Sequence, residues 1–185
     1  MIPNRLEKYF ESSAIAFFEE ATASKASVTS ITEISMQSHD CIMAIVGFTS
    51  AQMKGTIRLA TNTQNLFRSH PQIAQGLDIE ESDLANWAAE ILNQILDRFK
   101  DRLLPLGFHI ELSSSTLVKG SRLTFADHRG GYIFRDLATQ SGLHFSLGLN
   151  VNFETNYNPS YLDTCDTNDE VPLRECALYV QQQMN

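Results

Sequence analysis

The sequence predicts an α+β domain in which two long helices pack on one face of a mixed or antiparallel sheet. Two segments repeat apolar residues every three to four positions, which is the period of a helix with one buried face. Around them lie runs that are either continuously apolar or strictly alternating, as in the strands of a sheet. We place the domain at residues 1–154 and, at 155–185, an arm that could form a short helix.

The N-terminal half of the chain predicts a helix, a pair of strands and a second, short helix. Leu6 and Phe10 begin a series of apolar residues at helical spacing, with charged residues between them. A continuous apolar run from Cys41 suits a strand covered on both faces, and the chain then returns as its partner. The connecting loop at 49–54 is longer than a two-residue turn. The expected elements are a helix at 4–21, a strand within 24–37, strands at 41–48 and 56–60, and a helix at 63–69.

A long amphipathic helix at 83–104 is the clearest element. Ser82 or Asp83 can cap its start, and Pro105 followed by Gly107 ends it. Its apolar stripe consists of Leu84, Ala88, Ile91, Ile95 and Phe99, widened by Leu92, Leu96 and Leu103. The opposite face, at about 100° per residue, is centred on Asn86, Glu90, Asn93 and Asp97.

The C-terminal half predicts further strands and then an irregular arm. Alternation is strictest at 143–153, where every second residue from Leu143 is apolar, so that side of the strand should pack under a helix. After Glu154 the residues Asn, Asp, Thr, Tyr and Pro dominate, which indicates a loop or extended arm. The remaining expected elements are strands at 108–118, 122–126 and 132–135, a turn at 129–131 and a final helix at 171–184.

Composition excludes several classes of function. A formal net charge of −8 argues against a nucleic-acid partner, since phosphate contacts need clustered Lys and Arg. No apolar run reaches the ~18 residues of a membrane span, and residues 1–10 are too charged for a signal peptide, so we expect a cytoplasmic protein with no membrane partner. The three cysteines contain no CxxC pair and the five histidines lack short regular spacings, so we predict no metal site and no cofactor of its own. Cys41 is expected to be a small core residue.

The polar face of the long helix carries the pair Glu90 and Asn93, and no other Glu in the chain has Asn three residues later. Residues at this spacing are neighbours on a helix surface. The Asn carboxamide both donates and accepts hydrogen bonds, so it can hold a water molecule, while Glu can pair with a Lys or Arg of a docking protein. Together they can position water for attack on a phosphoryl group carried by a partner, and catalysis of phosphoryl transfer is largely positioning. Taken alone, the pair is far more typical of a solvated helix face, because nearly every such face carries some Glu and Asn.

The flanking segments extend this interpretation. The segment at 42–60, IMAIVGFTSAQMKGTIRLA, resembles the strand–turn–strand of the CheC/CheX/FliY chemotaxis phosphatase family. The residues that carry this likeness are the glycine–x–threonine of Gly47 and Thr49, the Lys–Gly of Lys54 and Gly55, and the Glu-x-x-Asn of Glu90 and Asn93 followed by Ile95. The stretch SSSTLVKG at 113–120 is similar to a Ser–Pro–Thr-like strand end of the family. With one helical motif rather than two, the chain looks more like CheX than CheC.

The resemblance implies a phosphatase that hydrolyses the phosphoaspartate of a CheY-like receiver domain. It implies that Asn93 positions the water, that Glu90 docks against a receiver lysine, that Mg²⁺ belongs to the receiver and that the chain forms a homodimer. We expect Asn86, Gln94 and Asp97 to line the partner interface. Three positions depart from the family pattern: Asn86 stands in place of Asp or Ser, Asp97 in place of Gly, and Ser115 in place of Pro.

Two other functions are open on the sequence alone. A non-enzymatic module with the same fold would hold a receiver domain or a flagellar-switch component without accelerating phosphate loss. A structural or signalling dimer would leave the helix face merely solvated, and replacing Glu90 or Asn93 by Ala would then change nothing. The phosphatase interpretation requires that neither side chain is buried or bonded within the fold.

Overall fold

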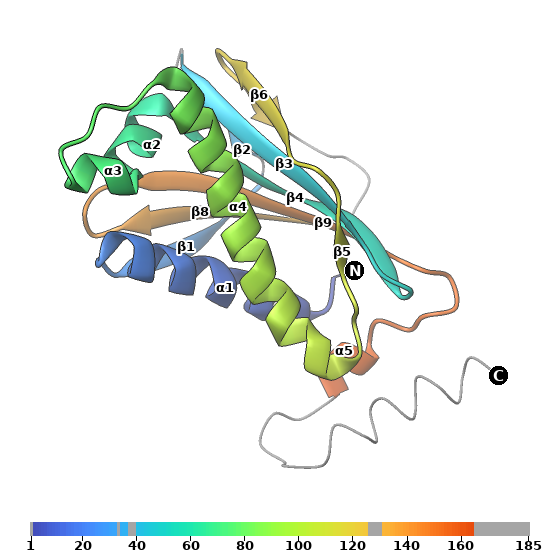
Figure 1. Cartoon of the computed structure of the whole chain (residues 1–185). Helices are drawn as coiled ribbons and strands as arrows, with labels where there is room; N and C mark the ends of the chain where they lie inside the picture. The colour runs from blue at the N-terminus through green and yellow to red at the C-terminus, as the bar shows by residue number, and fades with distance from the viewer. Residues whose placement is uncertain (1, 33, 37–39, 126–130, 165–185) are drawn as a thin grey trace.

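The structure has two layers, one of helices and one of strands. Helices α1 (Asn4–Thr22) and α4 (Glu81–Leu103) lie across one face of the sheet (Figure 1). The computed structural model describes residues 2–32, 34–36, 40–125 and 131–164. The other helices are α2 (Thr63–Ser69), α3 (Pro71–Ala74), the 3-10 turn η1 (Leu104–Leu106) and α5 (Tyr161–Thr164). The strands are β1 (Ala26–Ile31), β2 (Ile34–Ser35), β3 (Cys41–Thr49), β4 (Met53–Asn62), β5 (Glu111–Leu112), β6 (Thr116–Gly120), β7 (Thr124–Phe125), β8 (Tyr132–Thr139) and β9 (His144–Phe153).

The main sheet has seven strands in the order β1-β8-β9-β4-β3-β5, with β6 also paired to β3. Every pairing in it is antiparallel. The predicted α+β class with two long helices on one face is confirmed, and of the two predicted sheet types the antiparallel one is observed. Strands β2 and β7 form a separate two-stranded sheet.

The core lies between the sheet and the two long helices. Phe10 of α1 meets Phe99 of α4 edge to face, with ring centroids 6.1 Å apart. Phe18 of α1 lies 4.4 Å from the ring of Phe145 on β9. The alternating strand is therefore confirmed, with its apolar side under a helix. Because this burial holds the inner faces of both helices, their outer faces are available for polar residues.

An ion cluster around the buried Arg135, with two half-buried carboxylates, also joins α1 to the sheet. Arg135 of β8 points toward α1 and pairs with both Glu7 and Glu11, which are one helical turn apart. Burial raises the pKa of Glu11 above its ordinary value and lowers the pKa of Arg135, because desolvation disfavours both charged forms. The arginine and the two carboxylates compensate each other's charge at a position where an unpaired charge would destabilise the fold.

The far face of the sheet carries a smaller apolar cluster of Met43, Ala60 and Phe134. Burial on both faces accounts for the continuous apolar run of β3, as predicted for a central strand. Cys41 is fully buried, so its prediction as a core residue is confirmed. Tyr132 stacks on Phe134 with ring centroids 5.6 Å apart.

The prediction of one strand over 108–118 is wrong, because the chain forms two short strands with a bulge between them. Phe48 of β3 is opposite Leu112 of β5, whereas Ile45 is opposite Thr116 of β6. Two residues of β3 therefore face three residues of the neighbouring segment, which is the arrangement of a β-bulge. The strand pattern in the sequence does not reveal this interruption.

Ser113 holds the bulge in place. Its backbone N–H donates to the carbonyl oxygen of Gly47 at 2.9 Å, and its hydroxyl Oγ accepts from the N–H of Gly47, also at 2.9 Å. Three consecutive serines occupy this stretch, and short hydroxyl side chains often bond to backbone groups in place of a regular ladder.

Several predicted boundaries also need correction. Strand β4 begins at Met53 and not at 56, so the hairpin loop is shorter than expected, and β8 continues to Thr139 instead of ending at 135. Helix α4 begins at Glu81, and neither Ser82 nor Asp83 is its N-cap. Asp83 instead accepts from the backbone N–H of the capping residue Glu80 at 2.9 Å.

The first part of the C-terminal arm packs against the domain. The Asp163 carboxylate accepts from the backbone N–H groups of Asn4 at 3.3 Å and Arg5 at 2.9 Å, and so caps the start of α1. Leu162 is buried in the main core, and Tyr157 stacks on Phe153. The helix predicted at 171–184 and most of the turn predicted at 129–131 lie outside the described residues.

Candidate functional site on helix α4

The candidate site is the face of α4 that points away from the sheet. Eight apolar side chains hold the opposite face in the core, at the positions that the sequence predicts, namely Leu84, Ala88, Ile91, Leu92, Ile95, Leu96, Phe99 and Leu103. Since the helix is anchored along its whole length, residues on its outer face project from a rigid support. A rigid support is what a positioning role requires.

All five residues predicted for catalysis or partner binding lie on this outer face. Glu90 and three of its neighbours, Asn86, Gln94 and Asp97, are exposed. Asn93 is half-buried, because at about 100° per residue it lies roughly 60° from Glu90, toward the edge of the polar stripe. Neither member of the predicted pair is buried in the core.

Glu90 and Asn93 differ in the hydrogen bonds that they make on this face. The requirement that neither side chain is bonded within the fold is not fully met by Glu90, because Gln94 donates from Nε2 to Glu90 Oε1 at 2.8 Å. The second carboxylate oxygen of Glu90 has no described partner, so it can still accept a hydrogen bond from a docking protein. Lys100 Nζ lies 3.3 Å from Asp97 Oδ1 and partly neutralises it. Within the described part of the chain, the Asn93 carboxamide has no hydrogen-bond partner.

A hollow of about 270 Å³ adjoins this face beside Glu90. Helices α2 and α3 lie beside the N-terminal half of α4 (Figure 1). His70 and Gln72, at the start of α3, form the second wall of the hollow. The lining residues are His70, Gln72, Asp83, Asn86, Trp87 and Glu90. Sequence reasoning found Asn86 and Glu90 but missed the other four.

Trp87 ties the two walls of the hollow together. Its indole Nε1 donates to Ser69 Oγ at 3.1 Å, and its ring lies 5.4 Å from the His70 ring in an edge-to-face arrangement. The start of α2 is itself capped, since Asn62 Oδ1 accepts from the Asn65 N–H at 2.7 Å. The spacing of Trp87 three residues before Glu90 was a usable signal, whereas nothing local in the sequence places His70 beside α4.

Two classes of site receive no support from the described residues. Across 2–32, 34–36, 40–125 and 131–164, no three His, Cys, Asp or Glu side chains are grouped so as to hold a metal ion. Within the same ranges no helix combines the length and the apolar character needed to cross a membrane.

Several solved structures share this architecture. A CheC-like superfamily protein from Shewanella sp. PV-4 has a TM-score of 0.68 at 13% identity, over 82% of this chain and 99% of its own. Chemotaxis protein CheX from Vibrio vulnificus has a TM-score of 0.65 at 14% identity, over 80% and 99%. CheX from Borrelia burgdorferi, solved as a complex with CheY, BeF₃ and Mg²⁺, has a TM-score of 0.59 at 11% identity, over 79% and 97%. The chain has the CheC/CheX fold.

At the level of sequence alone, no protein-family model matches the chain and no curated protein matches it. The CheC/CheX fold is therefore recognised through the arrangement of elements and not through overall identity. The short motifs that carry the resemblance to this family lie in two separate places, with the stretch 113–120 beside β3 of the second. The helical motif is on the outer face of α4, and the glycine-containing motif is on the hairpin β3–β4.

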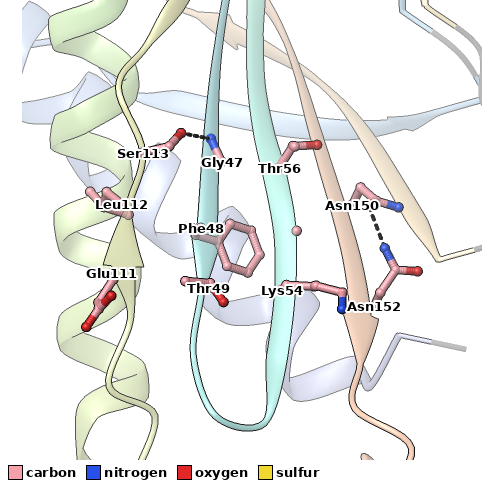
Figure 2. Close-up of a pocket in the computed structure, with 11 residues that line it drawn as sticks. Gly47, Phe48, Thr49, Lys54, Thr56, Glu111, Leu112, Ser113, Asn150 and Asn152 are labelled. Atoms are coloured by element: carbon pink, nitrogen blue, oxygen red, sulfur yellow. Dashed lines mark hydrogen bonds between the residues drawn. The ribbon is translucent and has the colours of Figure 1, made fainter.

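The motif residues of the hairpin line a larger hollow of about 550 Å³ (Figure 2). Thr49 and Lys54 alternate along their strands with buried core residues, so they face the side of the sheet opposite the helices. This hollow is therefore separated from Glu90 by the sheet. Its polar lining includes Thr56, Asn150, Asn152, Ser113 and Glu111.

Close packing explains why glycine occupies two of these motif positions. A Cβ on Gly55 would lie 2.0 Å from the carbonyl oxygen of Asn150 and 2.6 Å from Cζ of Phe48. A Cβ on Gly47 would lie 3.0 Å from Ser113 Oγ, which closes the bulge. The two glycines of the hairpin motif thus have a structural explanation, and the helical motif remains the candidate for chemistry.

Proposed function

We propose that this chain hydrolyses the phosphoaspartate of a CheY-like receiver domain that docks on the outer face of α4. The observation that supports this most is the state of the Glu90–Asn93 pair. Glu90 is exposed, and the Asn93 carboxamide has no hydrogen-bond partner among the described residues. The CheC/CheX fold adds support, since a CheX protein of the same fold is solved in a complex with CheY.

The reaction is attack by water on the phosphorus of the acyl phosphate. A bond forms between the water oxygen and phosphorus while the bond from phosphorus to the aspartate oxygen breaks. The products are inorganic phosphate, which takes up the water's oxygen, and the free aspartate carboxylate, and the proton is released to phosphate or solvent. Little covalent work is left to the protein, so the rate depends on placing the water in line.

Asn93 would place that water. Its Oδ1 can accept from the water while its Nδ2 donates to a phosphoryl oxygen or to the receiver. Being half-buried on an anchored helix, the side chain has fewer conformations to lose than a fully exposed one. In this proposal, the pre-orientation of Asn93 is what accelerates hydrolysis of the phosphoaspartate.

Glu90 would dock the receiver. Gln94 holds one of its carboxylate oxygens at 2.8 Å, and the second oxygen, which has no described partner, would face the receiver. A charge-assisted hydrogen bond to a Lys or Arg of the receiver would set the register of the two proteins. Asn86, Gln94 and Asp97 are exposed around it and would form the contact surface.

The proposal also includes a homodimer, Mg²⁺ bound by the receiver and a cytoplasmic location. The molar mass of the purified chain in solution tests the first of these. A mass equal to one chain, 20.8 kDa, at the concentrations used for activity would remove the homodimer from the proposal.

The direct test follows phosphate release from receiver domains of the same organism, phosphorylated with acetyl phosphate. We expect the chain to accelerate release and Asn93→Ala to lower that acceleration by about 10²-fold, as for loss of a positioning group. Asn156→Ala is the matched control, because Asn156 is exposed in the loop after β9. Equal rates for the wild type and Asn93→Ala would contradict the role of Asn93.

A receiver-binding adaptor is the second candidate, and Asp97 is the observation that favours it. Its exposed carboxylate is one helical turn from Asn93, where it would repel a phosphoryl group, and Lys100 only partly compensates. An adaptor would bind a receiver carrying BeF₃⁻ without accelerating phosphate loss. If Asp97 merely slows a phosphatase, Asp97→Asn should raise the rate.

A further inference from the structure

The hollow between α4 and the α2–α3 turn combines an aromatic wall with two carboxylates. Asp83, Trp87 and Glu90 are at positions i, i+4 and i+7 of α4, so they follow one another along a single stripe. The half-buried Trp87 is in the middle, with one carboxylate about a turn away on each side. All three line the hollow.

No described cation neutralises these carboxylates. The ion pairs among the described residues involve neither Asp83 nor Glu90. Asp83 uses Oδ2 to accept from the Glu80 N–H, and Glu90 uses Oε1 to accept from Gln94, so each has a second oxygen without a described partner. The hollow therefore has a carboxylate at each end of the stripe and the half-buried Trp87 side chain between them.

We infer that this hollow receives an arginine side chain of the partner protein. A guanidinium stacks on an indole face and donates two parallel hydrogen bonds to a carboxylate, which matches the order of groups along the stripe. An ammonium group could satisfy one carboxylate but would not use the flat wall as fully. The inference rests on the proposed function, since it makes the hollow a specificity pocket that includes the docking residue Glu90.

The residues opposite Trp87 are compatible with this ligand. His70 Nδ1 accepts from the Gln72 N–H at 3.2 Å, so this ring nitrogen is already used within the fold. Asn86 lies at the rim and is exposed. Asn86→Lys would bring a competing cation to the hollow without disturbing the core, because Asn86 is exposed.

Trp87 is the single tryptophan of the chain, so its indole N–H gives a unique NMR signal that reports on the hollow. We would titrate ¹⁵N-labelled full-length protein with N-acetyl-arginine amide and, separately, with N-acetyl-citrulline amide, its uncharged isostere. We expect a saturable shift of the indole signal with arginine, with a dissociation constant on the order of millimolar, and at least a roughly tenfold weaker response to citrulline.

Asn86→Lys should reduce the arginine response at least about fivefold through charge repulsion. Asn156→Lys adds the same charge at the other end of α4, next to Tyr157, which packs against Phe108, and should leave the response unchanged. No saturable arginine response, an equal response to citrulline, or an equal response in Asn86→Lys would each overturn the inference.

These outcomes are independent of the phosphatase test. A chain that accelerates phosphate release but ignores arginine would keep the proposed function and reject the pocket. A chain that binds arginine with the expected selectivity but accelerates no receiver would keep the pocket and reject the phosphatase. In the receiver assay, Asn86→Lys is expected to raise the receiver concentration needed for half-maximal rate, and Asn156→Lys is not.

Discussion

Replacing Gly55 by Ala should destabilise the hairpin strongly, because two strands leave no room for a Cβ there. The added carbon would lie 2.0 Å from the Asn150 carbonyl oxygen and 2.6 Å from Phe48 Cζ, and the first of these atoms belongs to the backbone of β9. A backbone atom in a paired strand cannot turn aside, so β4 and β9 must separate. Overpacking of this kind costs about 1–3 kcal/mol, and we expect the upper end.

For a chain of 185 residues, each 1 kcal/mol changes Tm by about 2–4 °C, so the expected loss is roughly 6–12 °C. Thermal unfolding followed by circular dichroism measures it. Gly120→Ala is the control, since its Cβ would meet Leu123 Cδ2 at 3.1 Å, the far end of a flexible side chain, and should cost at most about 1 kcal/mol. Similar Tm values for wild type and Gly55→Ala would refute the packing argument.

Three further outcomes are expected. Glu90→Lys should weaken receiver binding yet shift Tm by no more than about 2 °C, since the site is exposed, and a larger drop in calorimetry would contradict that placement. Arg135→Met should lower Tm by about 4–8 °C, or ~2 kcal/mol, because it leaves Glu7 and Glu11 without their cation. An unchanged Tm would show that the ion cluster makes no net contribution to stability. Burial raises the pKa of Glu11, so the folded chain holds this proton more tightly than the unfolded chain, and its contribution to stability falls as pH rises from the ordinary value of 4.5 through the raised one. The Tm of Glu11→Gln minus the Tm of the wild type should therefore increase as the pH rises across that interval. A decrease of this difference would contradict the raised pKa of Glu11.

Elements with a strong local period were predicted well from the sequence. The long helix was placed to within two residues at its start and one at its end, and β9 to within one residue, since both have an unbroken apolar pattern. Boundaries set by partners were predicted poorly. The bulge between β5 and β6 arises from bonds between Ser113 and Gly47, which are far apart in the chain.

The candidate site also has a part that could be predicted from the sequence and a part that could not. Sequence alone determined that Glu90 and Asn93 share the polar face of a helix, because the 3.6-residue period assigns each position a side once the apolar stripe is known. Only the tertiary structure decided that α2 and α3 lie against that helix and bring His70 next to Trp87. The physical reason is that a helical period reports on burial along one element, whereas a hollow depends on which separate elements pack together to cover the core.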